Sequence, residues 1–327
     1  MTIATTSGYF PVLYLLLKVA SAVGMGLVLK RAEARALDRL PLVRTNYAVA
    51  AVIGFFASLA LGQTHISGPA ALLAAFTGVL FVAGLLVWSR AIQAAGLALS
   101  VVAMRTAIVI PLLAAAIIWH ERPGPLELIG SAVALLALAL VLYDVAQRKS
   151  GDITGGDMTQ LSSIGIVSQA GTSAPARRGT APVFASALFW LALLFLADGL
   201  VMSAALVFRK ELPLTETMPF QTVIFVAAFF VSTLLYYLRR PGATRETLKW
   251  GALLGTANLG NYLFLVLALS VLPGLVVYPA IAAGEVGLMA VAGTVLWKEK
   301  VGVRSWLGIA LTVVALALIQ FGKPAGV

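Results

Sequence analysis

The stretch WHERPGPLELIG at 119–130 decides the fold, because a closely similar stretch, WKEKVGVRSWLG, returns at 297–308. The main shared residues, 178 positions apart, are Trp119, Glu121 and Gly130 in the first copy and Trp297, Glu299 and Gly308 in the second. By contrast, His120 is replaced by Lys298 in the second copy. The repeat therefore favours a duplicated helix hairpin over a catalytic pair made of His120 and Glu121.

The composition places the chain in the membrane class. Hydrophobic residues make up 61% of the 327 residues, charged residues make up 11%, and the mean hydropathy is +0.99. Soluble domains are usually about 45–50% apolar and about 25% charged. The net charge of +10 does not indicate a nucleic-acid partner, because the cations occupy short gaps between apolar runs and not a polar face.

Ten apolar runs are long enough to cross a bilayer as helices, which takes roughly 20 residues each. In the first half of the chain they lie at about 9–29, 44–62, 69–92, 97–119 and 126–143. In the second half they lie at about 183–207, 218–238, 249–271, 274–297 and 303–321. The sequence therefore predicts an all-α integral membrane protein with ten transmembrane helices.

A polar segment separates the ten runs into two groups of five. Residues 144–182 are rich in Gly, Ser and Thr, which predicts a flexible linker between a first repeat at 1–143 and a second at 183–327. Further repeated pairs, at offsets of 178 and 179, are GLALS (96–100) with GLVVY (274–278), and LVLKR (27–31) with LVFRK (206–210). Because five is odd, the second repeat must be inverted in the membrane, as in many secondary transporters.

Lysine and arginine residues other than Lys18 and Arg105 are divided unevenly between the two membrane faces. The face that holds loops 30–43, 144–182 and 239–248 carries 17 of them, and the face that holds both termini carries 4. Since cytoplasmic loops carry the excess of Lys and Arg, the count predicts that both termini lie outside the cytoplasm.

Four residues of the Asp, Glu, Lys and Arg types fall well inside the predicted helices: Lys18, Arg105, Asp198 and Glu285. Each costs roughly 2.5–3.5 kcal/mol at a helix centre on insertion scales, so each should face the bundle interior or water. Opposite charges occupy nearly equivalent repeat positions, which suits a substrate cavity at the repeat interface. Structural ion pairs or snorkelling side chains are the alternative. Glu285 and Asp198 are the proton-carrying candidates, because a guanidinium is not deprotonated in a protein.

The uncharged candidates for the cavity are Asn258, Asn261, Tyr262 and Tyr278. The two Asn residues lie three apart and share one helical face, where a buried amide would bind either a ligand or a neighbouring helix. A second Asn–Tyr pair occurs at 46–47. Aromatic residues that either line the cavity or serve in packing and the interfacial belt are Trp88 and Trp190.

Catalytic and cofactor-binding motifs are missing from the sequence. The chain has no Cys and only two His, which excludes a thiolate or His-rich metal site. The sequences HExxH and Gly-x-Ser-x-Gly and the Walker loop are also absent. We therefore expect no metal, no cofactor and no enzymatic activity.

The two hairpin stretches, Glu121-Arg122 through Gly130 and Glu299-Lys300 through Gly308, resemble those of the drug/metabolite transporter (DMT) superfamily in its EamA-like branch. NYLFLVLALSVLPGLVVYP at 261–279 adds to this resemblance, which covers the whole chain except the linker. It implies a ten-helix secondary transporter. Members move amino acids, nucleotide sugars, drugs, sugars and other metabolites, so neither a substrate nor binding residues follow. Many members keep both termini in the cytoplasm, the reverse of the charge count.

Together these observations predict a multi-pass secondary carrier of the cell inner membrane. It would export a small polar or amphipathic metabolite by alternating access, with proton coupling as a hypothesis. Its partners would be the small-molecule substrate and the lipid bilayer, and it would be a monomer or a homodimer. Two alternatives stay open: a lipid-carrier flippase that opens laterally between helices, and a non-transporting membrane scaffold or sensor with a solid midplane and all four charges paired.

Overall fold

The structure is a computed structural model that describes residues 11–35, 37–95, 103–104, 106–121, 124–151, 181–239, 242–297 and 303–321. Arg105, Glu299 and residues 152–180 of the predicted linker lie outside this part of the chain. The described part consists of helices and turns and contains no strand, which confirms the predicted all-α class for these residues.

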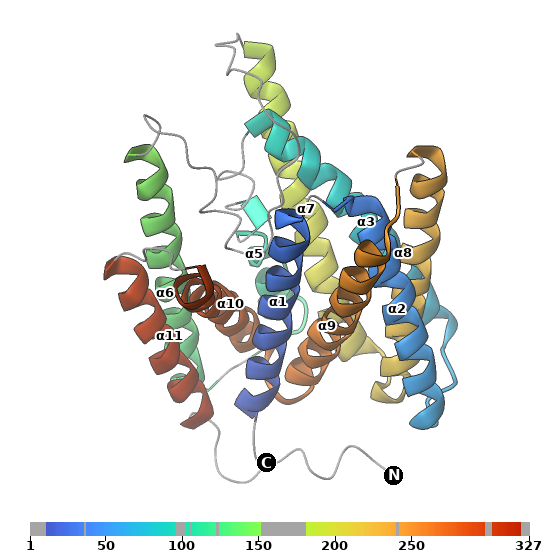
Figure 1. The fold of residues 1–327 in the computed structure, drawn as a ribbon. Helices are drawn as coiled ribbons and strands as arrows, with labels where there is room; N and C mark the ends of the chain where they lie inside the picture. Colours follow the sequence, from blue (N-terminus) through green and yellow to red (C-terminus); the bar gives the residue numbers. More distant parts are fainter. Residues whose placement is uncertain are drawn as a thin grey trace.

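Figure 1 shows the helices in their order along the chain. In the first half they are α1 (Pro11–Ala34), α2 (Arg39–Ala60), α3 (Gly68–Ala95), α5 (Val109–Ile117) and α6 (Pro125–Gly151). In the second half they are α7 (Ala181–Glu211), the 3-10 turn η3 (Leu214–Glu216), α8 (Thr217–Arg239), α9 (Arg245–Val271), α10 (Gly274–Trp297) and α11 (Val303–Phe321).

Most helices extend a few residues beyond the apolar runs that predicted them, because helical hydrogen bonding does not stop where the apolar run ends. At the start of α9, for example, the Thr244 hydroxyl accepts a hydrogen bond from the Thr247 backbone N–H at 3.1 Å and caps the helix. Similarly, α6 continues through residues 144–151, which the sequence assigned to the linker. The predicted run 97–119 is described only in part, and its longest described helix is α5.

Six of the described helices, α1, α2, α3, α7, α8 and α9, are long and apolar enough to cross a membrane. Shorter apolar stretches lie in α6, α10 and α11, at Leu128–Ala137, Gly274–Met289 and Trp306–Ile319. Large apolar side chains are exposed on the described helices, among them Leu72 of α3 at 74% and Phe230 of α8 at 66%. Exposed apolar area of this kind suits contact with lipid, so the fold has the features of an all-α membrane protein.

Most of the packing joins a helix from the first half of the chain to one from the second. Helix α1 packs on α9 and α3 packs on α7, while α2 lies against both α8 and α9. Helix α6 runs beside α11 and also contacts α10. In Figure 1, α1 begins and α11 ends at the lower end of the molecule, whereas α2 and α9 begin at the upper end.

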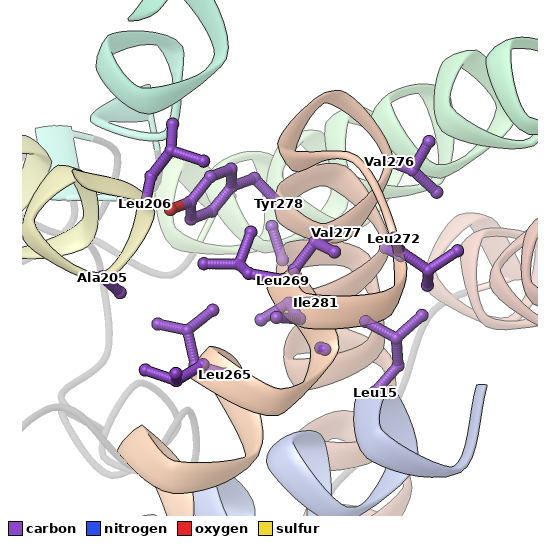
Figure 2. Close-up of a cluster of buried hydrophobic side chains, with 14 of the residues drawn as sticks. Leu15, Ala205, Leu206, Leu265, Leu269, Leu272, Val276, Val277, Tyr278 and Ile281 are labelled. Atoms are coloured by element: carbon purple, nitrogen blue, oxygen red, sulfur yellow. The ribbon is translucent and has the colours of Figure 1, made fainter. Parts of the chain in front are cut away.

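The largest hydrophobic core also joins the two halves (Figure 2). Its central side chains are Leu15 of α1, Leu206 of α7, Leu265 and Leu269 of α9, and Tyr278 and Ile281 of α10. The Tyr278 ring lies beside Leu206, and its hydroxyl donates to the Met202 carbonyl oxygen at 2.9 Å. This contact satisfies a polar atom that would otherwise be costly to bury.

Candidate functional site

A cavity of about 280 Å³ lies between α1, α2, α3, α7 and α9. It is bordered by the second half of α1, the first half of α2 and the second half of α3, which places it towards the upper end in Figure 1. Leucine, valine and methionine side chains form much of its wall. The polar and aromatic lining residues are Arg39, Asn46, Tyr47, Phe81, Trp88, Asp198 and Asn258.

Two charged side chains of opposite sign line the cavity in the described part of the chain. Arg39 begins α2, and its guanidinium carbon lies 6.0 Å from the centre of the Trp88 ring, within range of a cation–π interaction. Asp198 lies on α7 and also lines the cavity. A polar solute could therefore meet a cation, an anion and an aromatic face within one small space.

An amide pair forms a second polar feature of the lining. The Asn258 Nδ2 on α9 donates to the Asn46 Oδ1 on α2 at 3.2 Å, and the two residues are only 6% and 4% exposed. Gly255, one turn before Asn258, packs so closely on α2 that an added Cβ would lie 2.5 Å from the Asn46 carbonyl oxygen. The close helix contact thus fixes the position of both amides.

Aromatic rings extend from the cavity into the core behind it. Tyr47 and Phe81 both line the cavity, with ring centres 6.4 Å apart. Phe225 lies behind them, 6.4 Å from Tyr47 and 6.2 Å from Phe81. Such a cluster holds the wall rigid and offers flat apolar surfaces to a ligand.

Lys18 of α1 and Glu285 of α10 form an ion pair away from this cavity. Their side chains are 8% and 12% exposed. Gly284 lets the helices approach, since a Cβ there would lie 2.9 Å from Val19 Cγ2. The sequence prediction placed Lys18, Arg105, Asp198 and Glu285 in a single cavity; the structure brings Lys18 and Glu285 together, puts Asp198 in the cavity wall, and does not describe Arg105.

Of the four uncharged candidate residues, too, only part lies in the cavity wall. Asn258 lines the cavity, whereas Asn261, Tyr262 and Tyr278 lie outside its lining. Within the described residues, Asn261 Oδ1 and the Tyr262 hydroxyl are buried without a hydrogen-bond partner. Tyr262 instead packs its ring 6.0 Å from that of Phe81, behind the cavity wall.

The first hairpin stretch ties three helix ends together at the lower end of the molecule. Glu121 accepts a hydrogen bond from the Leu275 backbone N–H at 3.1 Å and forms an ion pair with Lys210 Nζ at 2.8 Å, and so connects the start of α10 to the end of α7. A carboxylate at a helix N-terminus is favourable because it meets free N–H groups and the positive end of the helix dipole. Trp119 adds a hydrogen bond from its Nε1 to Glu211 Oε1 at 2.7 Å.

The remaining hairpin residues are structural where they are described. Gly130 of α6 packs against α11, where an added Cβ would lie 2.8 Å from Ile319 Cγ1. Gly308 of α11 is buried, and Trp297 ends α10. His120 adopts a φ of 46°, in the left-handed region that lets the chain turn sharply between α5 and α6.

Arg39 is the charged lining residue that sequence reasoning missed. It was counted with the loop cations because it stands in the polar sequence LDRLP, just before an apolar run. The structure makes it the first residue of α2, so its side chain reaches the cavity. The position at the start of a helix, next to the Asn46–Tyr47 pair, was the only signal in the sequence.

Known proteins resemble the chain in fold more than in sequence. No family model matches it. An uncharacterized protein of Haemophilus influenzae is 24% identical over 247 residues, which cover 75% of this chain and 73% of that protein. A protein of known crystal structure superposes with a TM-score of 0.63 at 16% identity and covers 93% of this chain and 95% of its own. The fold is therefore one already seen in a solved structure.

Proposed function

We propose that the whole chain has ten transmembrane helices arranged as two inverted repeats. The packing supports this architecture. A two-fold axis would exchange α1, α2, α3 and α6 of the first half with α7, α8, α9 and α11 of the second. The α1–α9 contact then corresponds to the α3–α7 contact, and the α2–α9 contact corresponds to the α3–α8 contact. All four of these contacts are present. The α2–α8 and α6–α11 contacts convert into themselves, as expected around a two-fold axis.

Single glycines repeat the same relation. A Cβ added to Gly78 of α3 would lie 2.3 Å from the Ile224 carbonyl oxygen of α8, and one added to Gly255 of α9 would lie 2.5 Å from the Asn46 carbonyl oxygen of α2. Gly255 follows Gly78 by 177 positions, and Ile224 follows Asn46 by 178. The close approach of two helices thus recurs at equivalent places in both halves.

We propose that the protein is a secondary carrier for a small polar or amphipathic solute. The observation that carries this proposal is the cavity. Helices from both halves of the chain form its wall, and charged and amide side chains lie there among apolar ones. A scaffold has no need of such a space. At the other end, the Glu121 contacts hold the ends of α5, α7 and α10 together, as expected of a carrier open towards one side only.

The same proposal includes the location of the carrier, its family, the direction of transport and the coupling ion. The carrier would lie in the cell inner membrane, belong to the EamA-like branch of the DMT superfamily and export its solute. A proton would drive export through the carboxylates. Of these, Glu285 is held by Lys18, so protonation of Glu285 would release a buried ion pair and allow α1 and α10 to separate.

The test is efflux from proteoliposomes loaded with an isotopically labelled metabolite extract and analysed by mass spectrometry. We expect at least one solute class to leave the proteoliposomes faster than it leaves equally loaded liposomes without protein. The variant Val201→Trp should abolish this efflux by filling the cavity that Val201 lines. The neighbouring variant Leu200→Trp, on the 43% exposed side of the same helix, should not. Equal efflux from both variants, or none from the wild type, contradicts the proposal.

A further inference from the structure

The Asn46–Asn258 pair keeps unused hydrogen-bonding capacity next to the cavity, including a donor group on Asn46 and an acceptor on Asn258. Each primary amide has two N–H donors and a carbonyl acceptor, and the single bond from Asn258 Nδ2 to Asn46 Oδ1 uses only part of this capacity. In the part of the chain that the structure describes, Asn46 Nδ2 and Asn258 Oδ1 have no protein partner, and neither is sealed from the cavity that both residues line.

We propose that this cavity binds a small, planar ligand without net charge that carries a cis-amide edge, an N–H next to a carbonyl, on an apolar body. The ligand N–H donates to Asn258 Oδ1, and its carbonyl accepts from Asn46 Nδ2. Both protein groups are then satisfied in a largely apolar space, where an unpaired polar group is costly. The proposal names the substrate class of the carrier and therefore rests on the proposed function.

The charges of the lining favour a ligand without net charge. Arg39 and Asp198 have opposite signs, so the described lining carries no net formal charge. Each of them already takes part in an interaction within the chain. A carboxylate ligand would also place a second acceptor against Asn258 Oδ1, which repels it.

The shape and the aromatic lining favour a small planar body. A volume of about 280 Å³ lies just below the usual range of about 300–1,000 Å³ for drug-sized ligands. Tyr47, Phe81 and Trp88 contribute aromatic rings to the wall, against which a flat ring packs well. A lactam fused to an aromatic ring combines this body with the required edge.

The probe is isoquinolin-1(2H)-one, and its control is 2-methylisoquinolin-1-one, in which an N-methyl group replaces the N–H donor. Binding to the purified full chain in detergent is measured by calorimetry and by the shift of the thermal unfolding midpoint. We expect the N–H lactam to bind about tenfold more tightly, the value of one hydrogen bond to a site that is otherwise left unpaired. Equal affinities for the two lactams overturn the proposal.

A protein variant tests the same contact from the other side. Asn46→Asp keeps an oxygen acceptor for Asn258 Nδ2 but replaces the donor that faces the cavity by a second acceptor. At pH 9, which favours the ionised form, we expect affinity for the N–H lactam to fall about tenfold. Thr256→Val, on the exposed side of α9, is the control and should bind as the wild type does. Unchanged binding to Asn46→Asp contradicts the proposal.

Binding and transport results separate the two proposals. If the N–H lactam is preferred but no solute leaves the proteoliposomes, the ligand class stands and the carrier function is wrong. If efflux depends on the cavity but the lactams bind equally, the carrier function stands and the ligand class is wrong.

Discussion

At the residue scale, the structure assigns different tasks to charges that look alike in the sequence. Lys18 and Glu285 neutralise each other between α1 and α10, whereas Asp198 lines the cavity. The sequence predicts that these three charged residues face away from lipid, since a charge in lipid must find a partner or water. Which partner each one finds was not predictable, because it depends on how the helices cross.

The Lys18–Glu285 pair gives a prediction for stability and coupling. Glu285→Gln leaves a buried, uncompensated Lys18 and should lower the free energy of unfolding by about 3–5 kcal/mol. The double variant Lys18→Met/Glu285→Leu removes both charges and should unfold close to the wild-type midpoint in detergent. If Glu285 carries the proton, efflux by this folded double variant should no longer respond to an imposed pH gradient. Efflux that still follows the gradient rules out that role for Glu285.

At the element scale, helix positions are well anticipated and helix contacts are not. The apolar runs at 274–297 and 303–321 match α10 and α11 at both ends, because length and hydropathy suffice to locate an apolar helix. The linker boundary at 144 is less well anticipated, since α6 continues to Gly151. The hairpin stretch was understood as a repeated unit, but its bond to the start of α10 was not foreseen.

The glycines between helices give a prediction at this scale. Gly255→Ala should destabilise the protein by about 1–3 kcal/mol, because the new Cβ would overlap the Asn46 carbonyl oxygen of α2. If the halves are true repeats, Gly78→Ala should cost a similar amount against α8. Gly24→Ala on α1 meets open space, so it should be neutral or stabilise by up to about 1 kcal/mol. The measurement is the thermal unfolding midpoint in detergent; equal effects at all three sites contradict the packing argument.

At the scale of the whole molecule, the cavity lies towards the same end as the basic loops. In Figure 1, α2 and α9 begin at the upper end, which holds the loop between α8 and α9. The Lys and Arg count predicts that this end faces the cytoplasm; in an exporter of that orientation, the cavity would lie nearer to the solute to be collected.

Orientation can be measured directly because the chain contains no Cys. We expect Gly242→Cys, exposed between α8 and α9, to react with a membrane-impermeant maleimide in inside-out vesicles and not in spheroplasts. Thr64→Cys, exposed between α2 and α3 at the other end, should show the opposite pattern. The reverse result for both sites means that the termini are cytoplasmic, as the resemblance to EamA-like transporters implies, and that the charge count is wrong.

The sequence by itself determined the membrane class and the positions of most helices, and it predicted a repeat. These follow from run length, hydropathy and spacing, which need no knowledge of the fold. Only the tertiary structure decided that Arg39, Asn46 and Asn258 share a cavity wall with Asp198 while Tyr278 belongs to the core. Helices that are apolar all round carry no amphipathic stripe, so nothing in their sequence indicates which face meets the cavity, the core or the lipid.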